Sequence, residues 1–151
     1  MERCPCCNAR LTETAICPRC QADLSSVLGC EQTARQWLIN AIQFWYVHES
    51  KMAILALSKS IYLKRTLLAL VFRDLIIQEQ CQYVLGLLEK KEYVVAKELL
   101  SMMCNLNPHH KLSRRLYSFS KYLLVKDIIE IAIQQPNRIQ PTKIIDEHRT
   151  G

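Results

Sequence analysis

The chain begins with two copies of one short cysteine motif, and this repeat constrains its fold more than any other feature. Cys4 and Cys7 enclose a proline in the first copy, and Cys17 and Cys20 enclose a proline in the second, thirteen residues later. Each Cys-x-x-Cys turn directs two sulfurs to one side, and two such turns facing each other supply the tetrahedral thiolate set that Zn²⁺ prefers. We therefore predict one structural zinc ion per chain, bound by Cys4, Cys7, Cys17 and Cys20.

Disulfide bonds and free thiols are the alternatives for this quartet. The chain has eight cysteines in 151 residues, a density that also occurs in secreted disulfide scaffolds. Its first residues include Glu2 and Arg3 and form no apolar leader segment, so we expect a reducing, cytoplasmic environment. Apolar runs such as 67–72 stop at charged residues far short of a membrane span, and we expect no membrane segment.

The middle of the chain is poor in residues that interrupt helices. Residues 31–134 contain one glycine, Gly86, and one proline, Pro108, and half of the whole chain is apolar. Such a stretch predicts helices, and Thr33 with Gln36 fits a capping box at the start of the first one. The predicted organisation has four parts: a zinc ribbon at 1–24, a linker at 25–32, a helical domain at 33–134 and a flexible tail at 135–151.

The apolar spacing predicts about five helices arranged as antiparallel hairpins. The third begins near Thr66 and carries Asp74 within its apolar line, so either the helix breaks there or the carboxylate lies at the rim. The fourth ends before Pro108, and the fifth runs from about Lys111 to Ile133. In the fifth helix the predicted inward residues are Leu112, Leu116, Phe119 and Leu123, and the predicted outward cations are Lys111, Arg114, Arg115 and Lys121.

The fourth helix carries an aromatic residue, a small residue and a closing proline at Tyr93, Ala96 and Pro108. This spacing resembles the second helix of a tetratricopeptide repeat, and Ala53 fits the same small position in an earlier copy. The resemblance implies helical hairpins that stack on a shared core. The chain departs from that family because Ala53 and Ala96 are 43 residues apart rather than about 34, and Lys91 replaces the usual glycine.

Residues 1–24 resemble the short double-knuckle zinc ribbons at the ends of many bacterial proteins, and the Cys-Pro-x-Cys turn resembles that of rubredoxins. Rubredoxins place their two turns much further apart than the nine residues between Cys7 and Cys17, which favours structural zinc over redox iron. Cys6 is interpreted as an exposed extra thiol, and a redox or metal-relay role for it is an alternative. Buried packing is expected for the remaining three cysteines, Cys30, Cys81 and Cys104.

No group of residues in the sequence points to catalysis. A four-cysteine zinc site is coordinatively closed, and the pair His109 and His110 is expected in an exposed turn. We therefore predict a protein that is not an enzyme: a cytoplasmic adaptor or assembly subunit that binds another protein through the ribbon and the helical domain. The alternative is a nucleic-acid-binding accessory protein that uses the ribbon and the cations of the fifth helix. The formal charge of +6 makes the chain only mildly basic, and the excess lies on the helical part rather than on the ribbon.

Overall fold

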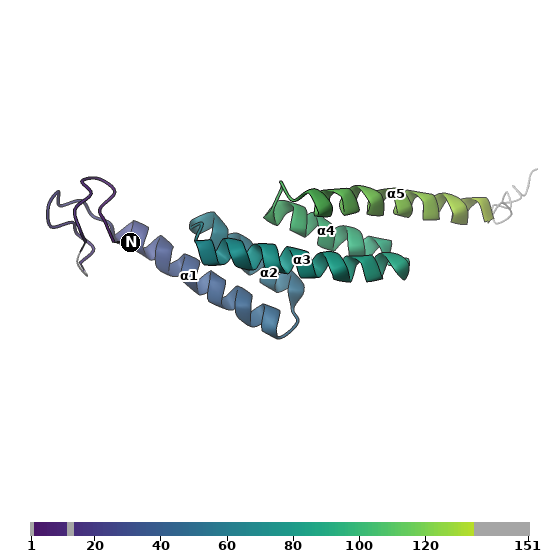
Figure 1. Cartoon of the computed structure of the whole chain (residues 1–151), viewed down its shortest axis with the longest axis horizontal. Helices are drawn as coiled ribbons and strands as arrows, with labels where there is room; N and C mark the ends of the chain where they lie inside the picture. The colour runs from purple at the N-terminus through teal and green to yellow at the C-terminus, as the bar shows by residue number, and fades with distance from the viewer. Residues whose placement is uncertain (1, 12–13, 135–151) are drawn as a thin grey trace, which may run out of the picture.

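The fold is mainly helical, as predicted. The structure, a computed structural model, describes residues 2–11 and 14–134, and the predicted tail at 135–151 lies outside the described residues. Figure 1 shows the cysteine-rich segment at one end of an elongated molecule and the last helix at the other. The five helices of the described chain are α1 (Ser25–Tyr46), α2 (Ser50–Leu63), α3 (Leu67–Glu89), α4 (Tyr93–Leu106) and α5 (Lys111–Gln134).

The first helix begins earlier than the sequence indicated. The predicted linker at 25–32 is the first part of α1, and the predicted capping box at Thr33 is wrong. The Thr33 hydroxyl instead donates to the carbonyl of Gly29 one turn earlier, at 2.8 Å. Leu28 packs against the cysteine cluster below it, which extends the helix back to the end of the second knuckle. The helix therefore joins the cysteine-rich segment directly.

Small residues bring α1 and α2 into close contact. Ala34 and Ala41 on α1, and Ala53 on α2, are at most 2% exposed. The Ser60 hydroxyl on α2 donates to the carbonyl of Ala34 on α1 at 2.8 Å. Because alanine and serine leave little side-chain volume between the helices, their backbones approach closely along this hairpin.

The second hairpin repeats the turn of the first after 43 residues. The Glu49 N–H donates to the carbonyl of Phe44 at 2.9 Å, and the Glu92 N–H donates to the carbonyl of Leu87 at the same distance. The residue before each of these glutamates has a positive φ, 62° in the first turn and 61° in the second. Both hairpins therefore use one turn geometry, and the matching helices α2 and α4 each contain 14 residues.

Ala53 and Ala96 occupy matching positions in the two hairpins, and both are 0% exposed. Helix α3 is continuous through Asp74, whose carboxylate is exposed and pairs with the guanidinium of Arg73 at 2.8 Å. Of the two arrangements predicted for Asp74, the structure therefore has the one at the rim. Thr66 caps this helix by accepting a hydrogen bond from the N–H of Ala69 at 3.2 Å.

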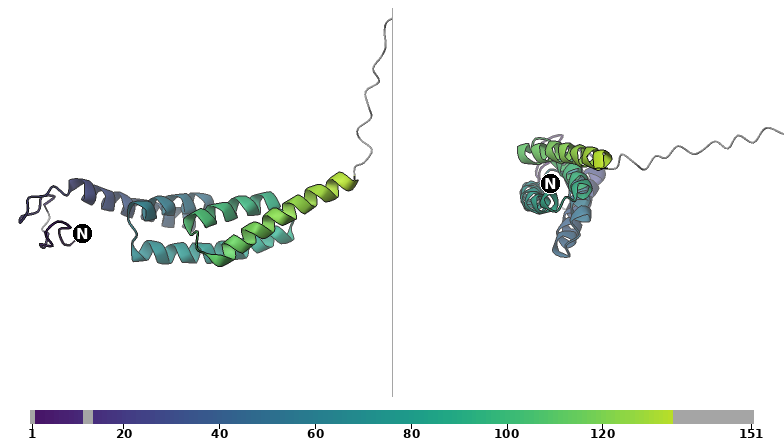
Figure 2. Two further views of the ribbon diagram at one scale, coloured as in Figure 1. Left: turned by 90° about the horizontal axis from the view of Figure 1, so that it is seen from above. Right: turned by 90° about the vertical axis from the view of Figure 1, so that its right-hand side faces the viewer.

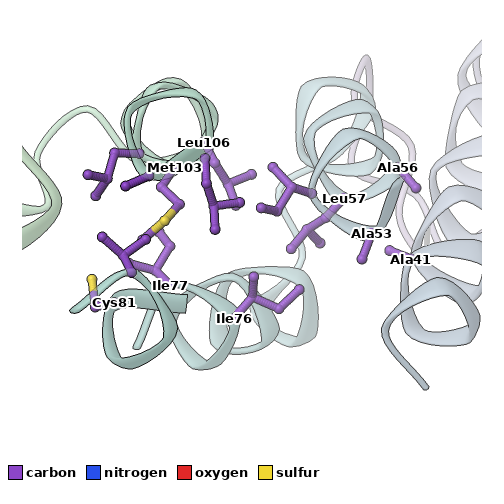
Figure 3. Close-up of a cluster of buried hydrophobic side chains, with 14 of the residues drawn as sticks. Ala41, Ala53, Ala56, Leu57, Ile76, Ile77, Cys81, Met103 and Leu106 are labelled. Atoms are coloured by element: carbon purple, nitrogen blue, oxygen red, sulfur yellow. The ribbon is translucent and has the colours of Figure 1, made fainter. Parts of the chain in front are cut away.

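The core is continuous from the first hairpin to the second. In Figure 3, Met103 of α4 points toward Ile77 of α3, while Leu57 of α2 lies nearer Ile76. These four side chains are at most 1% exposed. Burial of each such side chain contributes about 1.5–3 kcal/mol relative to exposure. The two hairpins are therefore held together by shared apolar packing.

The buried face of α5 differs from the prediction. Ser113 and Ser120 are fully buried, whereas Leu112 and Phe119 are 50% and 49% exposed. Leu116 and Leu123 pack against the core as partly buried residues. The two serines are small enough for α5 to lie close against α4, so the helix is rotated away from the face that hydrophobicity alone indicated.

Candidate metal centre and surface grooves

The two cysteine motifs fold into the same backbone turn. The N–H of Cys4 donates to the carbonyl of Ala9 at 2.9 Å, and the N–H of Cys17 donates to the carbonyl of Ala22 at 3.0 Å. Isolated antiparallel bridges flank each turn, one joining residues 3 and 10 and one joining residues 16 and 23. The sequence repeat of thirteen residues is therefore also a structural repeat.

Each turn closes through one residue in the left-handed region. Asn8 has a φ of 58° and Gln21 a φ of 56°. Their N–H groups donate to the carbonyls of Cys4 and Cys17, both at 2.9 Å. Asparagine tolerates this conformation better than most residues, which explains its place in the first turn. The left-handed residue reverses the chain just after each second cysteine.

The four predicted ligands lie together. The sulfur atoms of Cys4, Cys7, Cys17 and Cys20 are all within 4.8 Å of one another. The closest pairs join the two turns, with 3.5 Å between the sulfurs of Cys7 and Cys17 and 3.6 Å between those of Cys4 and Cys20. A tetrahedron with metal–sulfur bonds of about 2.3 Å has edges of about 3.8 Å, whereas a disulfide bond is about 2.05 Å. The quartet fits a metal ion and contains no disulfide bond.

Burial of the quartet is uneven. Cys4 and Cys17, the first cysteine of each motif, are 2% and 0% exposed and pack with Leu24. Cys7 is partly buried and Cys20 is exposed. One side of the sulfur cluster therefore rests on apolar side chains at the start of α1, and the other side faces solvent.

Backbone N–H groups stabilise the thiolate form of the first cysteines. The N–H groups of Cys20 and Arg19 donate to the Cys17 sulfur and lower its pKa to about 6. At Cys4, burial raises the pKa, but the equivalent N–H groups of the first turn outweigh burial and lower it below the ordinary value. Metal ions bind thiolates rather than thiols, so the lowered pKa values of Cys4 and Cys17 favour cation binding at both turns.

Cys20, unlike Cys4 and Cys17, requires a bound cation to stabilise its thiolate form. The N–H of Ala22 favours the Cys20 thiolate, but hydrogen bonds with Cys7 and Cys17 outweigh it and raise the pKa of Cys20. Sulfurs this close cannot all ionise without a neutralising charge. A divalent cation supplies the charge, which is why the donor set fits a metal better than four free thiols.

The other four cysteines do not join this cluster. Cys6 is exposed, as expected, and the neighbouring Cys4 thiolate raises its pKa. Cys81 is buried, as expected, whereas Cys104 is only partly buried. The expectation for Cys30 is wrong because it lies on an exposed face of α1. Within residues 2–11 and 14–134, the quartet is the one group of histidine, cysteine or acidic side chains arranged to hold a metal ion.

The two adjacent histidines, His109 and His110, lie in the turn between α4 and α5. The Nδ1 atom of His110 accepts the N–H of Ser113 at 3.2 Å and thereby caps α5. His109 lines an open groove of about 960 Å³ beside the start of that helix. The groove also brings together three of the predicted outward cations, Lys111, Arg114 and Arg115. The fourth, Lys121, instead lies over the ring of Tyr117, with 5.3 Å between its amine and the ring centre.

A second groove, not anticipated from the sequence, lies where the two hairpins meet. It measures about 850 Å³ and is lined by the end of α1 with the turn that follows it, the start of α2, the middle of α3 and part of α4. Aromatic side chains contribute to its wall, among them Trp45, Tyr46 and Tyr83. The sequence carried no signal for it because the lining residues are spread over four elements. We call this site the hairpin groove.

The chain matches no family model, and comparison with curated proteins and with solved structures likewise finds no match. Across residues 2–11 and 14–134, no helix has both the length and the apolar character that a membrane crossing requires.

Proposed function

We propose that this chain is a protein-interaction module, a cytoplasmic adaptor or assembly subunit that binds a segment of another protein in the hairpin groove. The observation that carries the proposal concerns Gln80, a residue in the wall of that groove: its buried side-chain oxygen accepts no hydrogen bond. Gln80 is 6% exposed, and its Nε2 atom donates to the hydroxyl of Ser50 at 3.2 Å. Its Oε1 atom has no hydrogen-bond donor in the described part of the chain.

An unpaired buried amide oxygen costs about 1–3 kcal/mol, and this cost is removed when the Gln80 amide turns toward a bound segment that offers an N–H group. The groove therefore favours an occupant with backbone or side-chain donors. Glu49 and Glu79 also line it, whereas Lys51 is the one lysine there. The wall thus adds a slight negative charge, which favours a basic or neutral segment over an acidic one.

Exposed aromatic rings supply the apolar part of the contact. Tyr46 is 84% exposed and Tyr83 is 57% exposed. Tyrosine offers a large contact area at a low cost in conformational entropy, and it is enriched among residues that dominate binding energy. The two rings stand on different hairpins, so a segment in the groove contacts both.

The cysteine quartet has a supporting role in this proposal. Zn²⁺ bound by Cys4, Cys7, Cys17 and Cys20 would close the two turns into a zinc ribbon and hold them rigid at the start of α1. A site with four thiolate ligands has no open position for a substrate, and the module is proposed to be non-enzymatic. The paired hairpins support the resemblance to tetratricopeptide repeats, whose stacked helices commonly bind peptides.

A photo-crosslinking experiment tests the proposal. A photoreactive phenylalanine replaces Tyr83 in the groove or, as a matched control, Tyr62, which is 90% exposed and does not line the hairpin groove. Both variants are expressed in native cells, irradiated and analysed for adducts by mass spectrometry.

We expect one defined protein adduct from position 83 and none from position 62. The Gln80→Leu change, which removes the unpaired acceptor, should reduce the adduct at position 83. Equal labelling at both positions, or no adduct at position 83, would contradict the proposal.

A second function, nucleic-acid binding, is favoured by one observation, the convergence of Lys111, Arg114 and Arg115 on a single groove. If these cations contact phosphates, changing both arginines to glutamate should weaken RNA or DNA binding and reduce its salt dependence. Filter binding at 50 and 200 mM salt measures both effects. Unchanged binding and salt slope would exclude this groove as the phosphate contact.

A further inference from the structure

Helix α5 carries a row of exposed apolar side chains on the side that faces away from the other helices. Its four members are between 52% and 70% exposed: Tyr122, Val125, Ile129 and Ile133. Residues three or four positions apart lie on one face of a helix, so these four form a continuous row. The fully buried Ser113 and Ser120 lie on the opposite face. We call this row the α5 outer strip.

The α5 outer strip lies along an edge of the molecule. Figure 1 and Figure 2 both show α4 and α3 to one side of α5, and the end of α5 continues beyond them. Helix α5 has 24 residues against 14 in α4, which explains this overhang. From Tyr122 to Ile133 the strip is about 16 Å long. A broad, flat partner can therefore lie against its whole length.

The part of the chain that leads into the strip is strongly positive. Residues 99–126 include five lysines and arginines and no aspartate or glutamate. Three of these cations line the groove of about 960 Å³ at the start of α5: Lys111, Arg114 and Arg115. The ion pairs within the described residues all involve other side chains, such as Lys126 with Glu130 at 3.7 Å. The three cations in the groove are therefore available to an anionic partner.

The cationic groove and the outer strip share one side of α5. Ser118 lines the groove, and it precedes Tyr122, the first residue of the strip, by four positions. One helical face therefore leads from the groove into the strip. The exposed aromatic rings of Phe119 and Tyr122 lie where the cations give way to aliphatic residues. A single partner that covers this side must offer negative groups to the first half of α5 and an apolar phase to the second.

We propose that this partner is the surface of an anionic lipid bilayer, on which α5 lies with its outer strip between the headgroups and the acyl chains. Lipid phosphates contact the cations of the groove, acyl chains cover the aliphatic residues, and the aromatic rings lie at the interface between the two. The helix rests on the bilayer and does not cross it, in keeping with the lack of a membrane-spanning helix in the described residues. This binding goes beyond the function proposed for the hairpin groove and does not depend on it.

The size and chemistry of the surface favour a bilayer over other partners. A nucleic acid supplies phosphates but no apolar phase for the strip. A row of four side chains is small for a protein contact, since a specific interface usually involves about 20–30 residues on each side. A bilayer needs no matching groove, and it supplies both the negative charge and the apolar phase.

Both parts of the surface should contribute to the affinity. Each cation close to an anionic bilayer strengthens binding about fivefold, and salt screens this attraction. The apolar strip adds affinity in proportion to the area that it buries. We therefore expect reversible binding that weakens when the cations are removed, when the strip is made polar or when the salt concentration rises.

Vesicle flotation with the full-length chain tests the proposal. One set of vesicles consists of phosphatidylcholine, and a second set also contains about 30 mol% phosphatidylglycerol, which is anionic. Ile129→Glu places a charge in the strip, and a double variant, Arg114→Gln with Arg115→Gln, removes two cations from the groove. These side chains are exposed, so the variants should fold, and far-UV circular dichroism checks that they keep their helices.

Two variants away from α5 are matched controls. Leu68→Glu places the same charge on α3, at a residue that is 61% exposed and lines neither groove. The double variant Arg65→Gln with Lys90→Gln removes two cations at exposed positions that likewise line neither groove. Each control therefore changes the net charge by the same amount as its α5 counterpart.

We expect the wild type and both controls to float with the anionic vesicles, and the wild type to bind vesicles of phosphatidylcholine alone at least tenfold more weakly. Ile129→Glu should weaken binding to the anionic vesicles at least tenfold, and the double arginine variant at least fivefold.

A wild type that does not float with the anionic vesicles would overturn the proposal. Equal binding to both kinds of vesicle, or an Ile129→Glu variant that binds like the wild type, would overturn it as well. Sedimentation velocity without vesicles covers the remaining occupant: a wild type that self-associates, is dispersed by Ile129→Glu and does not float would assign the strip to a second copy of the chain instead.

Discussion

Replacing Gln80 with leucine should make the folded chain more stable while it weakens binding in the hairpin groove. The substitution removes the unpaired Oε1 atom, which costs about 1–3 kcal/mol, and also the 3.2 Å hydrogen bond to Ser50, which contributes about 0.5–1.5 kcal/mol. Glutamine and leucine have similar helix propensities, so the backbone contributes little to the difference. We expect the Gln80→Leu chain to be about 1 kcal/mol more stable.

Urea unfolding followed by circular dichroism measures the change in the free energy of unfolding. In a thermal melt, a gain of about 1 kcal/mol should raise the melting temperature by about 2–4 °C. Gln82→Leu is the matched control, because Gln82 is exposed on the same helix and its replacement should leave stability nearly unchanged. If Gln80→Leu destabilises the chain by 1 kcal/mol or more, the Oε1 atom is satisfied in solution. The argument for an acceptor awaiting a ligand would then be refuted.

Three further outcomes are expected. Cys17→Ser should reduce bound zinc from about one ion per chain to none by mass spectrometry under native conditions, while far-UV circular dichroism retains most of the helical signal. Zinc affinity in competition with a chelator should fall from pH 8 to pH 5, because Cys20, whose pKa is raised, must lose a proton to bind zinc. The fall should steepen below about pH 6, where Cys17, whose pKa is lowered to about 6, also binds a proton; a constant affinity over this range would argue against thiolate ligands. Ser60→Ala should destabilise the first hairpin by about 0.5–1.5 kcal/mol through loss of its bond to α1, and Ser58→Ala, whose bond stays within α2, should cost less; equal losses would contradict this role of Ser60.

Local spacing in the sequence was sufficient to predict several features. The cysteine repeat predicted two matching turns, and the structure brings all four sulfurs within 4.8 Å. A near absence of glycine and proline predicted the helices, and Pro108 predicted the end of α4 at Leu106. These features depend on residues within a few positions of one another, so an amino-acid pattern carries them.

Where α1 begins was not predictable in this way. Thr33 and Gln36 form a plausible start signal, yet α1 begins at Ser25 because Leu28 finds apolar contacts on the cysteine cluster. Tertiary packing outweighed the local preference. The same competition decided that Thr33 bonds within the helix rather than at its end.

The sequence by itself determined the two knuckles, the number of helices and the 43-residue repeat of the hairpins. Only the tertiary structure decided how each helix is rotated: Ser113 and Ser120 face the core where Leu112 and Phe119 were predicted to face it. It also decided which residues line the hairpin groove and left Gln80 with an unpaired acceptor. The physical reason is that periodicity fixes one apolar face on each helix, whereas rotation and approach depend on the volumes of the side chains that meet across the interface.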